Sequence, residues 1–397
     1  MGRVACYLAA RMLKTLRVRQ YKSLERIELP LGGLTVLVGP NAAGKSNLID
    51  ALRLLQDGLR EDMRSAVKRR GDRSVLFESK AQSRWGDAFE LEIDCWLPGL
   101  PKTAWLDFHL QYDFRYSAGS VREETLDLRK SKPDRWLNRI YSARDGQLEF
   151  GVHRANGDAF KSPEPGLLAL KAISYLKNFD EVRQVRSFIE SWRFLVPEVA
   201  KIREPRRLSR EDVLESSGGN LANVLRTLDD AKSPALPRII EDLKTLLGFV
   251  EEVRTETERG QVSLLLREKG RATDLESLHL SDGTLRLLAI LTALHTLPSP
   301  GLLCIEEPEH GLHPALLGPL CGALRSVCEP RGGRQVILTT HSADLVDYIE
   351  PSELRPLARG EQGQTVLHKL DKRQLARWVK DFRLGELWKM RRVGGVP

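Results

Sequence analysis

Cysteine is scarce in this sequence, which has five cysteines among 397 residues and no CxxC pair. An odd number of cysteines without such pairs argues against a disulfide framework and against a cysteine-based zinc site. Free thiols are typical of a reducing compartment, so we expect the protein to act in the cytoplasm.

Long apolar runs are also missing. None approaches the roughly 20 residues that a helix needs to cross a bilayer, so we expect no contact with the membrane interior. No heptad array is long enough for a coiled coil. The apolar patch Val4–Ala10 is shorter than a secretory signal core, and no cleavage-site pattern follows it. We therefore expect residues 1–11 to be an extension in front of a domain that begins at Met12.

Charge, by contrast, is plentiful. Charged residues make up 29% of the chain, and 62 Lys and Arg against 54 Asp and Glu leave a net charge of +8. Such a balance permits contact with nucleic acid, although a solvated surface explains each basic cluster as well. The clusters lie at Arg64–Arg73, Lys201–Arg210 and Arg383–Arg392. The length predicts two lobes or one domain with a large insertion.

The hydrophobic pattern predicts a mixed α/β protein. A helical stretch runs from about residue 163 to residue 247, and near-continuous apolar strands followed by helices in the last third indicate a buried parallel sheet. The predicted strands are Leu13–Val18, Leu24–Leu29, Leu34–Val38, Phe89–Leu97 and Trp105–Phe114, with a hairpin over Phe249–Arg267.

The segment Gly39–Ser46 matches the phosphate-loop pattern GxxxxGK[ST]. It follows an apolar strand and precedes a helix, which is the context that the pattern requires. Backbone N–H groups of such a loop wrap phosphates, Lys45 would reach the β and γ phosphates, and Ser46 would bind Mg²⁺. The sequence therefore predicts a nucleotide site formed by Gly39, Asn41, Ala42, Ala43, Gly44, Lys45, Ser46 and Asn47.

Two acids follow the apolar strand Leu302–Ile305. A buried strand that ends in carboxylates places them at the edge of a sheet, beside a phosphate loop in a doubly wound fold. We expect Glu306 to hold Mg²⁺, directly or through water, and Glu307 to act as the general base on the attacking water. Solvated acids before the turn at Pro308 are the alternative.

Two further elements have both an ordinary and a functional explanation. Ser281 can cap a helix that runs to Leu294, as in any capped helix, or it can form with Gly283 the γ-phosphate site of a second subunit. His341 follows the apolar strand Val336–Thr340 and is either structural or a donor to the γ-phosphate beside Glu307.

Together the four elements resemble the ABC ATPase superfamily in order and spacing. GPNAAGKSN, LSDGTLR and EEPEHGLHP resemble its RecF/SMC/OLD-like branch, and in particular the short stand-alone predicted AAA family ATPases of bacteria. Three other segments extend the resemblance over Met12 to Pro397, namely IREPRRLSR, SSGGNLANVLRTL and LGELWKMRRVGG. More than half of the chain separates Lys45 from Ser281, which argues against a transporter cassette.

The resemblance implies an ABC-type P-loop head with a mixed sheet, an antiparallel β subdomain and a helical inserted lobe. The expected bounds are 12–160 and 249–397 for the ATPase and 161–248 for the insertion. It also implies a head-to-tail homodimer, or a higher homo-oligomer, in which each ATP lies between Lys45 of one subunit and Ser281 and Gly283 of the other. His310 and Gly311 fall in the stretch that resembles the D-loop, which crosses that interface. Gln82 is the nearest candidate for the Q-loop, with a solvated loop glutamine as the alternative.

Two functions agree with these motifs. One is an ATP-driven switch that acts on double-stranded DNA in repair or anti-phage defence, and the other is an ATP-dependent scaffold that regulates a protein partner. The 56 residues after His341 are too few for a TOPRIM nuclease domain, so we expect the effector, a nuclease or a toxin, to be a separate chain. A transporter-associated ATPase is a weaker third hypothesis, and Arg206 and Arg207 could line the dimer interface instead of binding DNA.

Overall fold

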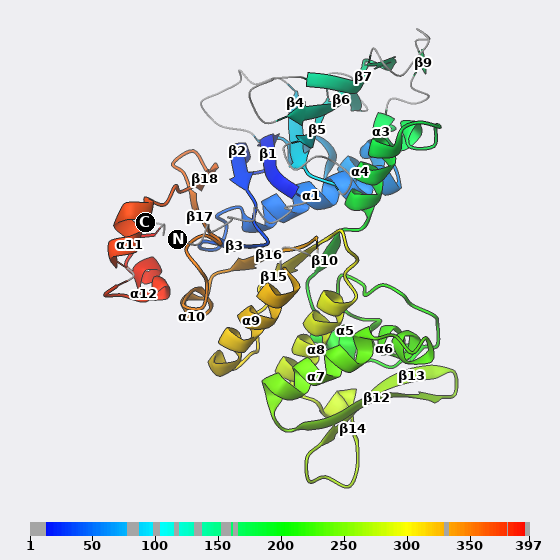
Figure 1. Cartoon of the computed structure of the whole chain (residues 1–397), viewed down its shortest axis with the longest axis vertical. Helices are drawn as coiled ribbons and strands as arrows, with labels where there is room; N and C mark the ends of the chain where they lie inside the picture. Colours follow the sequence, from blue (N-terminus) through cyan, green and yellow to red (C-terminus); the bar gives the residue numbers. More distant parts are fainter. Residues whose placement is uncertain are drawn as a thin grey trace, which may run out of the picture.

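The computed structural model describes residues 13–77, 87–97, 104–114, 119–130, 137–151, 160–161, 166–328, 333–378 and 380–393. Figure 1 shows an antiparallel sheet at the top, a mostly parallel sheet across the middle, and a helical layer below it. The helix α1 (Lys45–Arg60) lies between the two sheets. No helix in this part of the chain has the length and apolar content to cross a membrane.

The upper sheet has the strand order β2-β1-β4-β5-β6-β7-β8-β9. Its neighbours are antiparallel, and alternate residues point to one core, as Phe89, Leu91 and Ile93 do along β4. The strands are β1 (Leu13–Tyr21), β2 (Leu24–Pro30), β4 (Ala88–Cys95), β5 (Ala104–Asp113), β6 (Ser120–Lys130), β7 (Leu137–Arg144), β8 (Gln147–Phe150) and β9 (Phe160–Lys161). The antiparallel strands predicted from alternation are thereby confirmed to within a few residues.

The central sheet has the strand order β10-β15-β16-β3-β17-β18 and positions the candidate site. Its strands are β10 (Arg193–Leu195), β15 (Gly301–Glu306), β16 (Arg334–Thr340), β3 (Leu34–Val38), β17 (Leu354–Arg359) and β18 (Thr365–Leu367). All neighbours are parallel except the β17–β18 pair. The sheet is buried on both faces: Leu37 and Ile337 join the upper core with α1, whereas Val36 and Leu338 join the lower core. The predicted buried parallel sheet is confirmed, and its apolar runs are continuous because both faces need them.

The lower layer contains a group of helices around α8 and a small third sheet. Helix α8 (Asp282–His295) is buried over most of its length, with Leu285, Leu288 and Leu291 fully enclosed. The helices around it are α5 (Val199–Arg203), α6 (Leu221–Asp230), α7 (Ala235–Leu247) and α9 (Leu317–Val327). The third sheet contains β11 (Arg206–Arg207), β12 (Val250–Glu258), β13 (Gln261–Glu268) and β14 (Leu275–Glu276). Four other short helices are α2 (Met63–Lys68), α10 (Ala343–Val346), α11 (Lys372–Trp378) and α12 (Leu384–Lys389).

The stretch 161–248 is largely helical, as predicted, but it is not one continuous helical unit. Its helices α3 (Ala169–Ile173) and α4 (Asp180–Glu190) pack into the upper core, and α5–α7 belong to the lower one. The predicted helical stretch is interrupted between them, because α4 ends at Glu190 and β10 pairs in parallel with Leu303–Ile305 of β15. Backbone pairing along an edge of the central sheet outweighs the helical spacing of the side chains.

Candidate functional site

The phosphate-loop segment connects β3 to α1, as its sequence context predicts. Val38 is the last residue of β3, and Lys45 is the first residue of α1. Gly44 caps the helix with a φ of 93°, and a Cβ at this position would collide with Thr365 Oγ1. Glycine is therefore needed here both for its backbone conformation and for the space around it.

Lys45 is almost fully buried under the loop. Its Nζ donates to the carbonyl oxygens of Gly39, at 2.7 Å, and Pro40, at 2.9 Å. Burial lowers the pKa of Lys45, while the nearby carboxylates of Glu307, Glu309 and Glu306 act in the opposite direction. The ammonium group is thus placed where an added anion would be its strongest partner.

A pocket of about 460 Å³ opens over the loop. Its lining consists of Ser23, Asn41, Ala42, Gly44, Lys45, Ser46, Asn47, Glu307, Arg359 and Gly363. Ser23, in the β1–β2 turn, and Arg359 and Gly363, at and after the end of β17, were not predicted. No local pattern marks these three residues. The pairing of β17 with β3 brings Arg359 and Gly363 to the loop, whereas Ser23 bonds to Asn47 and Thr365. Asn47 also uses its amide inside the protein, because its Nδ2 donates to Ser23 Oγ at 2.7 Å.

Glu306, the last residue of β15, lies against the loop. Ser46 Oγ donates to Glu306 Oε2 at 2.6 Å, although 260 positions separate the two residues in the chain. A hydroxyl and a carboxylate offer the hard oxygen donors that Mg²⁺ prefers. The donor chemistry of this pair therefore fits Mg²⁺.

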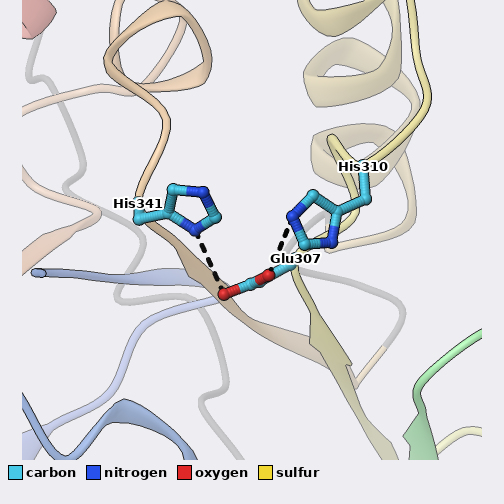
Figure 2. Close-up of side chains that lie close together, drawn as sticks. All are labelled: Glu307, His310 and His341. Carbon is cyan, nitrogen blue, oxygen red and sulfur yellow. Dashed lines mark hydrogen bonds and ion pairs between the residues drawn. The ribbon is translucent and has the colours of Figure 1, made fainter. Parts of the chain in front are cut away.

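The second acid, Glu307, has an unusual backbone and two histidine partners. Its φ is 47°, and its N–H donates to the carbonyl oxygen of Thr339 at 3.1 Å. Its carboxylate lies 3.1 Å from His341 Nδ1 and 3.1 Å from His310 Nε2, on opposite sides (Figure 2). A left-handed non-glycine residue is characteristic of functional sites, where the surrounding structure holds the strain. The position of His341 beside Glu307 was predicted from the sequence, whereas that of His310 was not.

Ser281 and Gly283 form a second group of predicted residues, at the start of α8. Ser281 is the predicted N-cap, and its Oγ accepts from the N–H of Thr284 at 3.2 Å. A Cβ on Gly283 would lie 2.7 Å from the carbonyl oxygen of Gly311, so the helix start packs tightly on the loop that follows Glu307. In the part of the chain that the structure describes, Ser281 and Gly283 do not line the pocket over the phosphate loop.

Arg203, in the IREPRRLSR segment, holds the same helix start from the other side. Its Nη1 donates to the carbonyl oxygens of Ser277 and Leu278, both at 3.0 Å, and its Nη2 pairs with Asp282 at 2.5 Å. This arginine of the second basic cluster is therefore engaged within the protein.

Three arginines of the first basic cluster, Arg64–Arg73, also form ion pairs with acids of the same chain. Arg70 bonds to Asp50 at 2.9 Å and to Asp57 at 2.7 Å, and Arg69 and Arg73 contact Glu61 and Asp87 respectively. These ion pairs reduce the positive charge that this face offers to a polyanion. Gln82, the Q-loop candidate, and the proposed extension 1–11 lie outside the described residues.

Comparison with known proteins identifies a family and a fold. The profile described as "AAA domain, putative AbiEii toxin, Type IV TA system" matches residues 34–347. An OLD nuclease of Thermus scotoductus is 46% identical over 54 residues, which are 14% of this chain and about a tenth of the length of that relative.

Two solved structures resemble the fold over nearly the whole chain. The Smc head bound to the C-winged helix domain of ScpA has a TM-score of 0.54 at 14% identity, covering 92% of this chain and 99% of that one. A Smc head with an extended coiled coil, bound to the C-terminal domain of ScpA from Pyrococcus furiosus, has the same TM-score at 12% identity, covering 93% and 99%. The chain therefore has the SMC-head-like fold of ABC-type P-loop ATPases, as the sequence motifs predict.

Proposed function

The chain belongs to this AAA-domain family, and we propose that it binds and hydrolyses Mg-ATP and acts as a nucleotide-gated switch. The observation that carries the proposal is that two segments far apart in the sequence meet at one pocket. Lys45, Ser46 and Glu307 line it, and Glu306 accepts a hydrogen bond from Ser46. A charged loop lysine, a hydroxyl–carboxylate pair and a second carboxylate are the groups that phosphoryl transfer to water needs.

Each group has a separate task in this proposal. The loop N–H groups and Lys45 bind the phosphates, and Lys45 exchanges its two carbonyl partners for phosphate oxygens. Ser46 and Glu306 hold Mg²⁺, which neutralises charge on the β- and γ-phosphate oxygens when bound. Glu307 takes the proton of the attacking water, and His341 orients that carboxylate and donates to the γ-phosphate.

The start of α8 supplies the other half of each site in an ATP-bound dimer. In one chain Ser281 and Gly283 are held on a rigid helix terminus by Arg203, and they are free of the pocket over their own phosphate loop. A helix N-terminus favours an added anion. We therefore propose that they contact the γ-phosphate bound by a second subunit, so that ATP joins two heads and hydrolysis releases them.

We further propose that this switch controls a separate effector, a nuclease or a toxin, in DNA repair or anti-phage defence. The family description names a toxin–antitoxin system, and the relative with 46% local identity is named as a nuclease, which supports an effector of one of these classes. Direct binding of double-stranded DNA is one way to control the switch. The alternative is a scaffold that responds to a protein partner, and the internal pairing of Arg69, Arg70 and Arg73 favours it.

Steady-state ATP hydrolysis with and without linear duplex DNA tests these proposals. We expect Glu307→Gln to lower turnover by about 10²–10⁴-fold, the usual contribution of a general base, and to accumulate ATP-bound dimers in light scattering. We expect Lys45→Ala to abolish ATP binding. Glu350→Gln, a change at an exposed carboxylate away from the pocket, is the matched control and should hydrolyse ATP at the wild-type rate.

The outcomes separate the alternatives. Turnover by Glu307→Gln at the wild-type rate would refute its role as base. Stimulation by DNA that fades with added salt supports a DNA-controlled switch, because phosphate contacts are salt-sensitive. Turnover that ignores DNA at every salt concentration supports control by a protein partner.

A further inference from the structure

Glu307, His310 and His341 form a three-residue cluster with the chemistry of a transition-metal site. Each offers one ligand atom, and these atoms all lie within 4.8 Å of one another. They come from two segments, because Glu307 and His310 follow β15 and His341 follows β16. Figure 2 shows both imidazole rings turned toward the carboxylate between them. We propose that this cluster is a binding site for a zinc-class divalent cation, separate from the Mg²⁺ site at Ser46 and Glu306.

The distances in the cluster suit such a cation. Glu307 Oε1 lies 3.1 Å from His341 Nδ1, and Glu307 Oε2 lies 3.1 Å from His310 Nε2. Two ligand atoms that are 3.1 Å apart and each about 2.0–2.1 Å from a metal subtend an angle of about 100° at that metal. This angle lies between the tetrahedral and octahedral values. The two pairs use different oxygens of the Glu307 carboxylate, so a single cation would draw the two imidazoles together around that carboxylate.

The ligand types separate the two metals. Two imidazoles and one carboxylate suit Zn²⁺, Co²⁺ and Ni²⁺, whereas Mg²⁺ prefers oxygen donors only. Ser46 and Glu306 supply oxygen donors alone. This chain can therefore hold Mg²⁺ at Glu306 and a softer cation at the neighbouring Glu307.

The cluster is accessible to solvent, and backbone hydrogen bonds hold its ligand residues in place. The side chains of Glu307, His310 and His341 are 28%, 52% and 40% exposed, so a hydrated cation can enter and retain water as further ligands. The backbone N–H of Glu307 is tied to Thr339 of β16, and the N–H of His310 donates to the carbonyl oxygen of Glu307 at 3.2 Å. These bonds hold the donors of the two segments at the same edge of the sheet before any metal binds.

Occupancy of this site has a functional consequence, which rests on the proposed function. A bound cation would engage the carboxylate of Glu307 and the ring of His341, so neither could serve the attacking water or the γ-phosphate. Lys45 and the loop N–H groups would stay free to bind ATP. The site thus makes hydrolysis, rather than ATP binding, sensitive to zinc-class cations.

Titration of the full chain with Co²⁺ in the absence of ATP, followed by its visible absorption, tests the site directly. We expect one high-affinity equivalent with the intensity of a four- or five-coordinate ion, displaced by Zn²⁺ but not by Mg²⁺. His310→Gln and His341→Gln should each weaken binding at least about tenfold. His313→Gln is the matched control, because His313 lies in the same loop with its Nδ1 accepting from the N–H of Ala315 at 3.2 Å, and it should bind as wild type does. Absence of binding, or His310→Gln binding like the control, would overturn the proposal.

A second measurement separates this inference from the proposed function. Zn²⁺ added to the wild-type protein with Mg-ATP should lower turnover while bound ATP stays constant, and the effect should be at least about tenfold weaker in His310→Gln relative to its own zinc-free rate. If Co²⁺ binds as expected but no ATP turnover is detected without zinc, the metal site stands and the proposed function fails. If Co²⁺ binds and zinc leaves turnover unchanged, the inhibitory role is refuted.

Discussion

A buried carboxylate in the upper sheet makes the stability of this protein depend on pH in a specific way. Glu124, on β6, is fully buried and accepts three hydrogen bonds: from Tyr141 Oη at 2.6 Å and from the N–H groups of Ala169 and Leu170 at 2.7 and 2.6 Å. It thereby joins the sheet to the start of α3. Burial raises the pKa of Glu124 to about 7, even though the three donors favour the ionised form.

The sign and size of the effect follow from this shift. An exposed glutamate has a pKa near 4.5, so between pH 4.5 and 7 the unfolded chain has released a proton that the folded chain still holds. Stability from Glu124 is therefore fully present below pH 4.5 and is lost as the pH rises through 7. The loss amounts to roughly 2–3 kcal/mol between pH 5 and pH 8, because each unit of pKa shift corresponds to about 1.4 kcal/mol.

Glu124→Gln removes the titration while keeping the shape of the side chain. We would measure the free energy of unfolding of both proteins in urea at several values between pH 5 and pH 8. The difference between wild type and variant should change by roughly 2–3 kcal/mol over this range, in favour of wild type at low pH. Glu149→Gln, an exposed position on β8, is the control and should show a constant difference. A constant difference for Glu124→Gln as well would mean that the three donors outweigh burial, and would refute the reasoning.

Two further predictions concern contacts between segments. Gly283→Ala should lower the free energy of unfolding in urea by about 1–3 kcal/mol, because its Cβ would lie 2.7 Å from the carbonyl oxygen of Gly311. Gly322→Ala is the control and should be neutral or stabilising, because a Cβ there meets no atom within 4 Å. Equal effects of the two substitutions would contradict this explanation. Gln335→Leu should lower the melting temperature and cost at least about 2 kcal/mol, since it leaves the N–H and carbonyl groups of Leu13 without their buried partners at 2.6 and 2.9 Å. Unchanged amide exchange at Leu13 in that variant would show that Gln335 does not tie β1 to the central sheet.

The sequence alone was sufficient to predict the local elements of the site. The strand Leu34–Val38 has the predicted bounds, and Ser281 caps the helix that follows it. These features could be predicted because each depends on a few consecutive residues: an apolar run long enough for a strand, a glycine-rich turn, or a hydroxyl before a helix. Glu306 and Glu307, at the end of β15, could also be placed at the edge of the sheet, since the residues before them are apolar on both faces.

Other features depend on which segments lie next to one another, and only the tertiary structure decided them. Arg359 reaches the pocket because β17 pairs with β3, and β10 takes an edge of the central sheet in spite of its helical flank. His310 faces Glu307 because the turn after β15 brings its ring back over the carboxylate, opposite His341. These contacts join residues that lie between three and several hundred positions apart in the chain. They depend on strand register and side-chain direction, which the local sequence pattern does not predict. The sequence by itself therefore determined the phosphate loop and the two acids of the candidate site, and the fold determined which other residues meet them.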